Sequence, residues 1–155
     1  MGSSTGNGYR GPLWNELAAD GHPLDFVGTG RNGSMSDPDN EGHSGYRIDQ
    51  IAALADASLT RYRPNVVTLH IGTNDLQGAS EVDTAIARLR SLVNQITADV
   101  PDATVLVASL VVSTSASEEQ YRGAYNQAVP RIVSDAQAAG KHVAYVDMSS
   151  LTTAD

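Results

Sequence analysis

The 155-residue sequence contains no cysteine. This absence excludes a disulfide framework and any site in which thiolates bind a metal. Histidine occurs four times, but no two histidines have the spacing that places a pair of metal ligands on one helix face. We therefore expect no metal and no other cofactor.

Positive charge and long apolar runs are also scarce. Lysine occurs once, at Lys141, and the formal net charge is −8. Proteins that bind nucleic acid need a basic surface, so we expect no nucleic-acid partner. No apolar run approaches the roughly 18 residues of a membrane span, and Met1 starts a polar stretch rather than a signal segment. We expect no membrane partner either.

Helical and strand patterns alternate along the rest of the chain. Its length suits one domain, residues 1–155. Alternating elements with strands that are apolar on both faces indicate a parallel sheet covered on both sides. The predicted fold class is α/β, a three-layer α/β/α, flavodoxin-like sandwich. Helices are predicted at Pro12 to Asp20, Arg47 to Leu59, Glu81 to Val100 (capped by Ser80) and Ser117 to Ala139; strands are predicted at Leu24 to Gly28, Asn65 to Ile71, Thr104 to Val112 and His142 to Asp147.

Ligands of such sheets bind outside the carboxyl ends of the strands. The segments expected to meet there are Gly28, Gly72 to Asp75, Val111 to Ser115, and Asp147. The pattern opens without a leading strand and ends without a closing helix. We therefore expect the domain to be incomplete at both ends.

Gly28 to Gly33, "GTGRNG", matches the dinucleotide-binding pattern G-x-G-x-x-G. That function needs a helix directly afterwards, whose N-terminus holds the pyrophosphate. The residues that follow have no helical periodicity and include Pro38. A glycine-rich loop is therefore the better interpretation.

A second candidate is "EGHSG", Glu41 to Gly45, which comes immediately before a predicted helix. The backbone N–H of a glycine there can face outward and bind an anion or a developing oxyanion, but a tight entry turn explains Gly45 equally well. Ser44 and His43 could suggest a nucleophile and its base. Adjacent residues rarely present both side chains to one carbonyl, which disfavours that pair.

The strongest local signal is "GTND", which follows the strand ending near Ile71. The side-chain amide of Asn74 could donate to an oxyanion, or Asn74 could simply close a turn. Asp75 is expected to tie the loop, and His70 to be a structural histidine of the strand.

Together, "EGHSG" before a helix and "GTND" after the next strand resemble two signature blocks of the SGNH, or GDSL, hydrolase superfamily. The stretch from Tyr9 through "EGHSGYRIDQIA" is similar to its carbohydrate-esterase branch, which includes acetylxylan esterases. The resemblance implies that Gly45 and Asn74 are oxyanion-hole donors. It also implies a nucleophilic serine in a "GDS" block and an Asp/His pair in a D-x-x-H block, and neither block occurs in this sequence.

The resemblance implies a serine esterase that removes acetyl or short acyl groups from a small-molecule or polysaccharide ester. Without the serine and histidine blocks, the chain itself is expected to be a nearly inactive fragment. A noncatalytic module that keeps the crevice to hold a sugar is the alternative. Secretion is an expectation from the family alone.

Overall fold

The structure is a computed structural model that describes residues 6–77 and 81–152. The chain divides into two compact units, Met1–Ser44 (the first unit) and Gly45–Asp155 (the second unit). The cap predicted at Ser80 lies outside the described residues.

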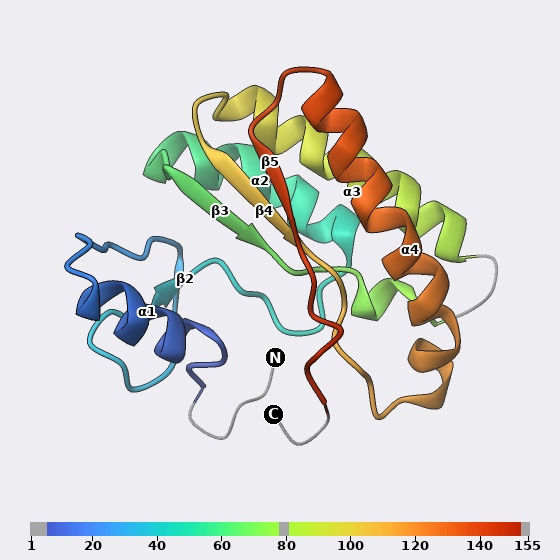
Figure 1. The fold of residues 1–155 in the computed structure, drawn as a ribbon, viewed down its shortest axis with the longest axis horizontal. Coiled ribbons are helices and arrows are strands. Elements are labelled where there is room, and N and C mark those ends of the chain that lie inside the picture. Colours follow the sequence, from blue (N-terminus) through green and yellow to red (C-terminus); the bar gives the residue numbers. More distant parts are fainter. Residues whose placement is uncertain (1–5, 78–80, 153–155) are drawn as a thin grey trace. The chain divides into compact units, whose positions relative to one another are not determined.

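The second unit is built on a parallel sheet of three strands in the order β3 (Val66–Leu69), β4 (Thr104–Ala108) and β5 (Val143–Val146) (Figure 1). Their β-branched side chains suit a pleated, half-buried surface. The register sets Val67 beside Val105, and Val105 beside Val143, so these side chains share one face. The strands form where the sequence predicts them and end earlier, because the residues that follow form the loops of the carboxyl edge.

Three helices of the second unit, α2 (Ile48–Tyr62), α3 (Val82–Asp99) and α4 (Ala116–Ala138), lie on one face of this sheet (Figure 1). Val105 and Val107, which face the helices, are 0% and 1% exposed, whereas the intervening Leu106 is only half-buried. Successive right-handed crossovers in one direction place their helices on the same face. The α/β class with a parallel sheet is confirmed. Within the described part of the second unit no helix covers the opposite face, so the third layer stays a prediction.

Helix α3 shows why the apolar periodicity predicts this unit well. Leu89, Val93 and Ile96 recur at helical spacing and are at most 3% exposed. Burying one such side chain stabilises the fold by about 1.5–3 kcal/mol. Among the described residues, no helix combines the length and the hydrophobicity of a membrane-spanning segment.

The first unit contains helix α1 (Arg10–Ala19) and a short antiparallel pair, β1 (Gly30–Arg31) and β2 (Asp39–Asn40). The guanidinium of Arg10 donates four hydrogen bonds of 2.8–3.3 Å to backbone carbonyls of this unit. No helix follows "GTGRNG" before Ile48 in the described chain, which agrees with the glycine-rich loop interpretation.

The strand predicted at Leu24 to Gly28 is wrong. A strand needs a neighbour to complete its ladder, and the Phe26 N–H donates instead to the Asp37 carboxylate at 2.6 Å. The Phe26 ring packs edge-on against Trp14, with ring centres 5.4 Å apart. Side-chain contacts within the first unit thus replace the strand pairing that the apolar run suggested.

Candidate active site

The carboxyl ends of the three parallel strands form one edge of the second unit. Gly72 to Asp75 follow β3, Val111 to Ser115 lie in the loop after β4, and Asp147 follows β5, as the sequence predicts. Gly28 belongs to the first unit and follows no strand. Its predicted place beside the other three segments depended on the strand that does not form.

The turn after β3 requires a glycine at its first position. Gly72 has φ +122°, and a Cβ there would lie 2.5 Å from the hydroxyl oxygen of Tyr125. That hydroxyl, fully buried on α4, donates to the Ile71 carbonyl at 2.9 Å. Burial raises the pKa of Tyr125, so the phenol keeps the proton that it donates. Tyr125 thereby fixes where the strand ends and the turn Thr73–Asp75 begins.

Asn74 lies in this turn, half-buried, with its side-chain amide directed at the chain segment that precedes α2. Its Nδ2 donates to the carbonyl of Tyr46 at 2.9 Å. An amide nitrogen carries two hydrogens, so this bond orients Asn74 and leaves a second N–H for another acceptor. Within the second unit, Asn74 therefore contacts the residue that directly follows Gly45.

Gly45 is exposed and has φ +80°, a left-handed conformation that favours glycine. A Cβ at this position would have no atom within 4 Å, so conformation rather than crowding requires the glycine. Among the described residues no hydrogen-bond acceptor engages the Gly45 N–H. The tight entry turn and an available donor are thus both present at this residue.

Asp75, the neighbour of Asn74, is buried and directed into the protein. Its Oδ2 accepts the N–H of Ile48, the first residue of α2, at 3.0 Å, and its Oδ1 accepts from Arg88 at 3.3 Å. Burial raises the pKa of Asp75, and the Ile48 and Arg88 hydrogen bonds counteract that rise. The predicted tie of the loop is confirmed, although its partner lies 27 residues away.

The ends of β4 and β5 are held by similar contacts. The side chain of Asn126, on α4, exchanges two hydrogen bonds with the backbone of Leu110, at 2.8 and 2.9 Å. Asp147 accepts from the backbone N–H and the hydroxyl of Ser149, and these bonds lower its pKa. The edge that carries Asn74 is therefore a set of fixed loops.

The remaining polar candidates have structural surroundings. In the first unit, His43 pairs with Glu41, with 2.7 Å between Nε2 and Oε1, and Ser44 is exposed. His43 thus has a carboxylate partner within the first unit. His70, just after β3, is half-buried, and burial lowers its pKa. Its structural role stays a prediction.

Sequence reasoning missed the residues that hold the site from other elements. Tyr125, Asn126 and Arg88 lie on helices, and their partners at the edge are 54, 16 and 13 residues away. No local motif signals such contacts. A polar or aromatic residue on the buried side of a helix is the one hint the sequence offers, and Tyr125 shows it.

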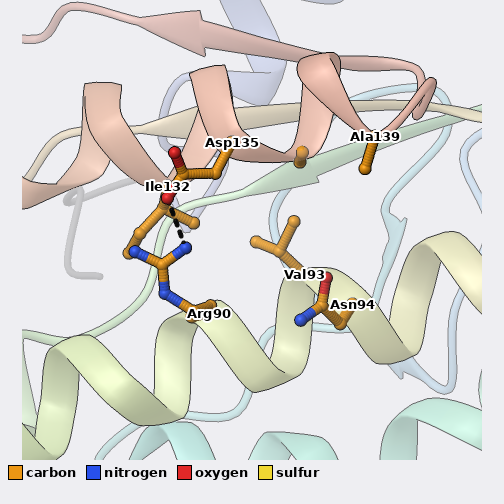
Figure 2. Close-up of a pocket in the computed structure, with 7 residues that line it drawn as sticks. Arg90, Val93, Asn94, Ile132, Asp135 and Ala139 are labelled. Carbon is orange, nitrogen blue, oxygen red and sulfur yellow. Dashed lines mark hydrogen bonds and ion pairs between the residues drawn. The ribbon is translucent and has the colours of Figure 1, made fainter.

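Depressions occur at two places on the described part of the second unit. One, lined by Val112, Arg122, Ser149, Leu151 and Thr152, has about 330 Å³ and lies beside the loops after β4 and β5. The other, about 170 Å³, lies between α3 and α4, where Arg90 and Asp135 form an ion pair (Figure 2). This second depression lies beside the middle of α3 and the C-terminal end of α4. That end of α4 leads into the start of β5, so the depression is away from the carboxyl edge that carries Asn74. Within the described residues no cluster of His, Asp and Glu has the arrangement of a metal site.

Comparisons with known proteins give a consistent result. A family model described as "GDSL-like Lipase/Acylhydrolase family" matches residues 1–155. A family 3 carbohydrate esterase of Clostridium thermocellum is 34% identical, with a TM-score of 0.84 over 94% of this chain and 70% of that one. A family 3 carbohydrate esterase from Talaromyces cellulolyticus is 25% identical, with a TM-score of 0.79 over 90% and 72% of the two chains.

One curated relative, an Acetivibrio thermocellus protein provisionally named endoglucanase X, is 34% identical over 104 residues. The match covers 67% of this chain and 43% of that protein's length. The two solved structures confirm the α/β fold with its parallel sheet.

Proposed function

The chain belongs to the GDSL-like lipase/acylhydrolase family, and from this membership we propose that it carries the oxyanion-stabilising part of a serine esterase. Hydrolase chemistry on esters is the family's character, which agrees with the motifs "EGHSG" and "GTND". The proposed substrate is an acetyl or other short-chain ester of a carbohydrate. The family 3 carbohydrate esterases among its structural neighbours support that substrate class.

The observation that carries the proposal is the hydrogen bond from Asn74 to the carbonyl of Tyr46. It holds a side-chain N–H donor next to the exposed backbone of Gly45. When a nucleophile attacks an ester carbonyl, negative charge develops on the carbonyl oxygen. Two preorganised N–H donors stabilise that charge without reorganising during the reaction, and one such donor contributes about 10²–10³-fold in rate.

The second part of the proposal concerns the nucleophile. The sequence contains neither Gly-Asp-Ser nor any Asp-x-x-His. Serine hydrolases without their nucleophile lose roughly six orders of magnitude in turnover and keep only the contribution of binding and oxyanion donors. We therefore expect the 155-residue chain to hydrolyse 4-nitrophenyl acetate or acetylated xylo-oligosaccharide no faster than buffer does. Stoichiometric labelling by a serine-directed phosphonate, at Ser44 or elsewhere, would contradict this expectation.

A binding measurement tests the donors independently of turnover. Acetate carries its charge on oxygen, as the intermediate does, so titration of ¹⁵N-labelled chain with acetate should shift the Gly45 amide and the Asn74 side-chain amide together. Asn74→Ala should abolish the Gly45 response. Asn94→Ala is the matched control, because Asn94 lies in the remote depression between α3 and α4. Unchanged acetate affinity in Asn74→Ala would refute the proposed role.

The alternative is a noncatalytic module that binds a sugar. Its binding place would be the depression of about 330 Å³ at the carboxyl edge. Its lining combines Arg122 and Ser149 with Val112 and Leu151, a mixture of polar and apolar groups that suits a sugar ring. That alternative predicts measurable binding of xylo-oligosaccharides that carry no acetyl group. The esterase proposal requires no such binding, so the same titration with unacetylated ligand separates the two.

A further inference from the structure

Asp75 is the one carboxylate that is fully buried among the described residues, and the esterase chemistry proposed above gives it no task. Its side chain is 1% exposed. Burying a carboxylate is costly unless charged or hydrogen-bonding partners compensate it. A carboxylate retained beside a candidate donor therefore calls for an explanation in terms of its partners.

Those partners come from two helices. The N–H of Ile48 donates to Oδ2 at 3.0 Å, which satisfies a donor in the first turn of α2. Arg88 of α3 donates to Oδ1 at 3.3 Å, and Arg47, which precedes α2, approaches the same oxygen at 3.9 Å. Asp75 thus joins the turn after β3 to the beginning of α2 and to α3.

Asn74 and Asp75 together grip the chain segment of residues 46–48, which leads into α2, at two points. Asn74 donates to the carbonyl of Tyr46, and Asp75 accepts the N–H of Ile48. One bond alone would let this segment pivot relative to the turn. Two bonds of opposite direction, two residues apart, fix its position and its rotation, and Gly45 is the residue immediately before the gripped segment.

We propose that Asp75 is a positioning residue that sets the separation and orientation of the Gly45 N–H and the Asn74 amide by anchoring the first turn of α2. The inference rests on the proposed function of those two donors. It explains why an acid is kept in this place, since the two oxygens of one carboxyl group accept from two elements at once, from Ile48 at the start of α2 and from Arg88 on α3.

The charges around Asp75 allow a matched control. Arg88 also pairs with Asp49 at 3.5 Å, and Arg47 also pairs with Glu81 at 3.1 Å. Asp49 is exposed on α2, so Asp49→Asn removes a carboxylate from the same arginine and leaves the Ile48 anchor in place. Asp75→Asn keeps an oxygen that can accept from Ile48 but removes the charge, whereas Asp75→Ala removes the acceptor altogether.

The test is ¹⁵N NMR of the complete chain near neutral pH, with and without acetate. For Asp75→Asn we expect shifts of the Gly45, Ile48 and Asn74 amide signals, about tenfold faster hydrogen exchange at Ile48, and about tenfold weaker acetate binding. Asp75→Ala should bind acetate more weakly still than Asp75→Asn. Asp49→Asn should equal the unmodified chain in acetate affinity and in hydrogen exchange at Ile48. If Asp75→Ala does not fold, Asp75→Asn decides the matter alone, because it retains the acceptor.

The possible failures are distinguishable. A folded Asp75→Asn chain that binds acetate as well as the unmodified chain would overturn the positioning role and leave the proposed function standing. If the unmodified chain shows no acetate response at Gly45 or Asn74, the proposed function fails. The spectra without acetate then test the positioning role of Asp75. Amide shifts confined to residues 45–48 and 72–76 in Asp75→Asn support that role. Spectra of Asp75→Asn and of the unmodified chain that are identical at residues 45–48 refute it.

Discussion

The two units of this chain are stabilised in different ways. All of the buried core residues lie in the second unit, from Ile48 onward, whereas no described residue of the first unit is buried to that extent. The first unit depends on polar contacts, such as the hydrogen bonds of Arg10 to backbone carbonyls and of Thr29 to Glu41. The second unit has an apolar core, formed by side chains of its helices and by the side chains of the sheet that face them.

Because of this difference, the apolar pattern of the sequence predicts the second unit better than the first. Apolar periodicity reports burial, so it predicts the second unit, where burial determines the structure. The apolar run at Leu24 to Gly28 sits among loops held by hydrogen bonds, and there it predicts a strand that does not form. The motif "EGHSG" spans the boundary, because Glu41 to Ser44 belong to the first unit and Gly45 to the second.

The largest effect is expected at the turn of the second unit. Gly72→Ala should destabilise the protein by about 3 kcal/mol or more, because alanine is strained at φ +122° and its Cβ would overlap the Tyr125 hydroxyl. Thermal unfolding should then occur roughly 10 °C lower. Gly140→Ala is the control, since Gly140 has φ +78° with no atom within 4 Å of a Cβ, and it should cost about 1 kcal/mol. Equal losses would show that close approach of Tyr125 is unimportant.

A smaller loss is expected when Tyr125 keeps its ring and loses its hydroxyl. Tyr125→Phe leaves the Ile71 carbonyl without this donor, which should cost about 1–2 kcal/mol in urea unfolding. Tyr121→Phe serves as the comparison, because Tyr121 packs against the same core from the same helix. A Tyr125→Phe variant as stable as the unmodified chain would show that this hydroxyl does not stabilise the end of β3.

Substitutions in the first unit should act locally. Arg10→Ala removes bonds to the carbonyls of Pro38, Asp39, Gly6 and Asn32, so hydrogen exchange across residues 30–40 should accelerate by about tenfold. The unfolding midpoint of the second unit should stay unchanged. Arg31→Ala, which loses only an exposed pair with Asp39, should have little effect on exchange. A parallel loss of stability in the second unit would show that the two units unfold together.

The smallest expected effect is on the pH dependence of stability. Because the pKa of Asp75 is raised in the folded protein, the folded state holds a proton that the unfolded state has already released. The contribution of Asp75 to stability is therefore fully present below the ordinary aspartate pKa and is lost as the pH rises through the raised value. Urea unfolding at several pH values should show this slope in the unmodified chain and not in Asp75→Asn. A difference between the two chains that does not vary with pH would contradict the raised pKa.

For the fold, the sequence predicts the three helices and three strands of the second unit to within a few residues, because the helices have a helical apolar spacing and the strands are short apolar runs. For the candidate site, the sequence singles out Gly45 and Asn74 through short motifs at the ends of predicted elements. It offers no way to see that Asn74 bonds Tyr46 across 28 residues. It also predicts a strand before Gly28 that does not form.

By itself, the sequence determined the α/β class and the family, since periodicity and motifs are properties of neighbouring residues. Only the tertiary structure decided how the turn "GTND" is held: Tyr125 from α4 fixes its beginning, and Asp75 fixes its end to α2 and α3. The physical reason is that these bonds depend on distances between elements. Helix packing on the sheet sets those distances, and no local pattern in the chain encodes them.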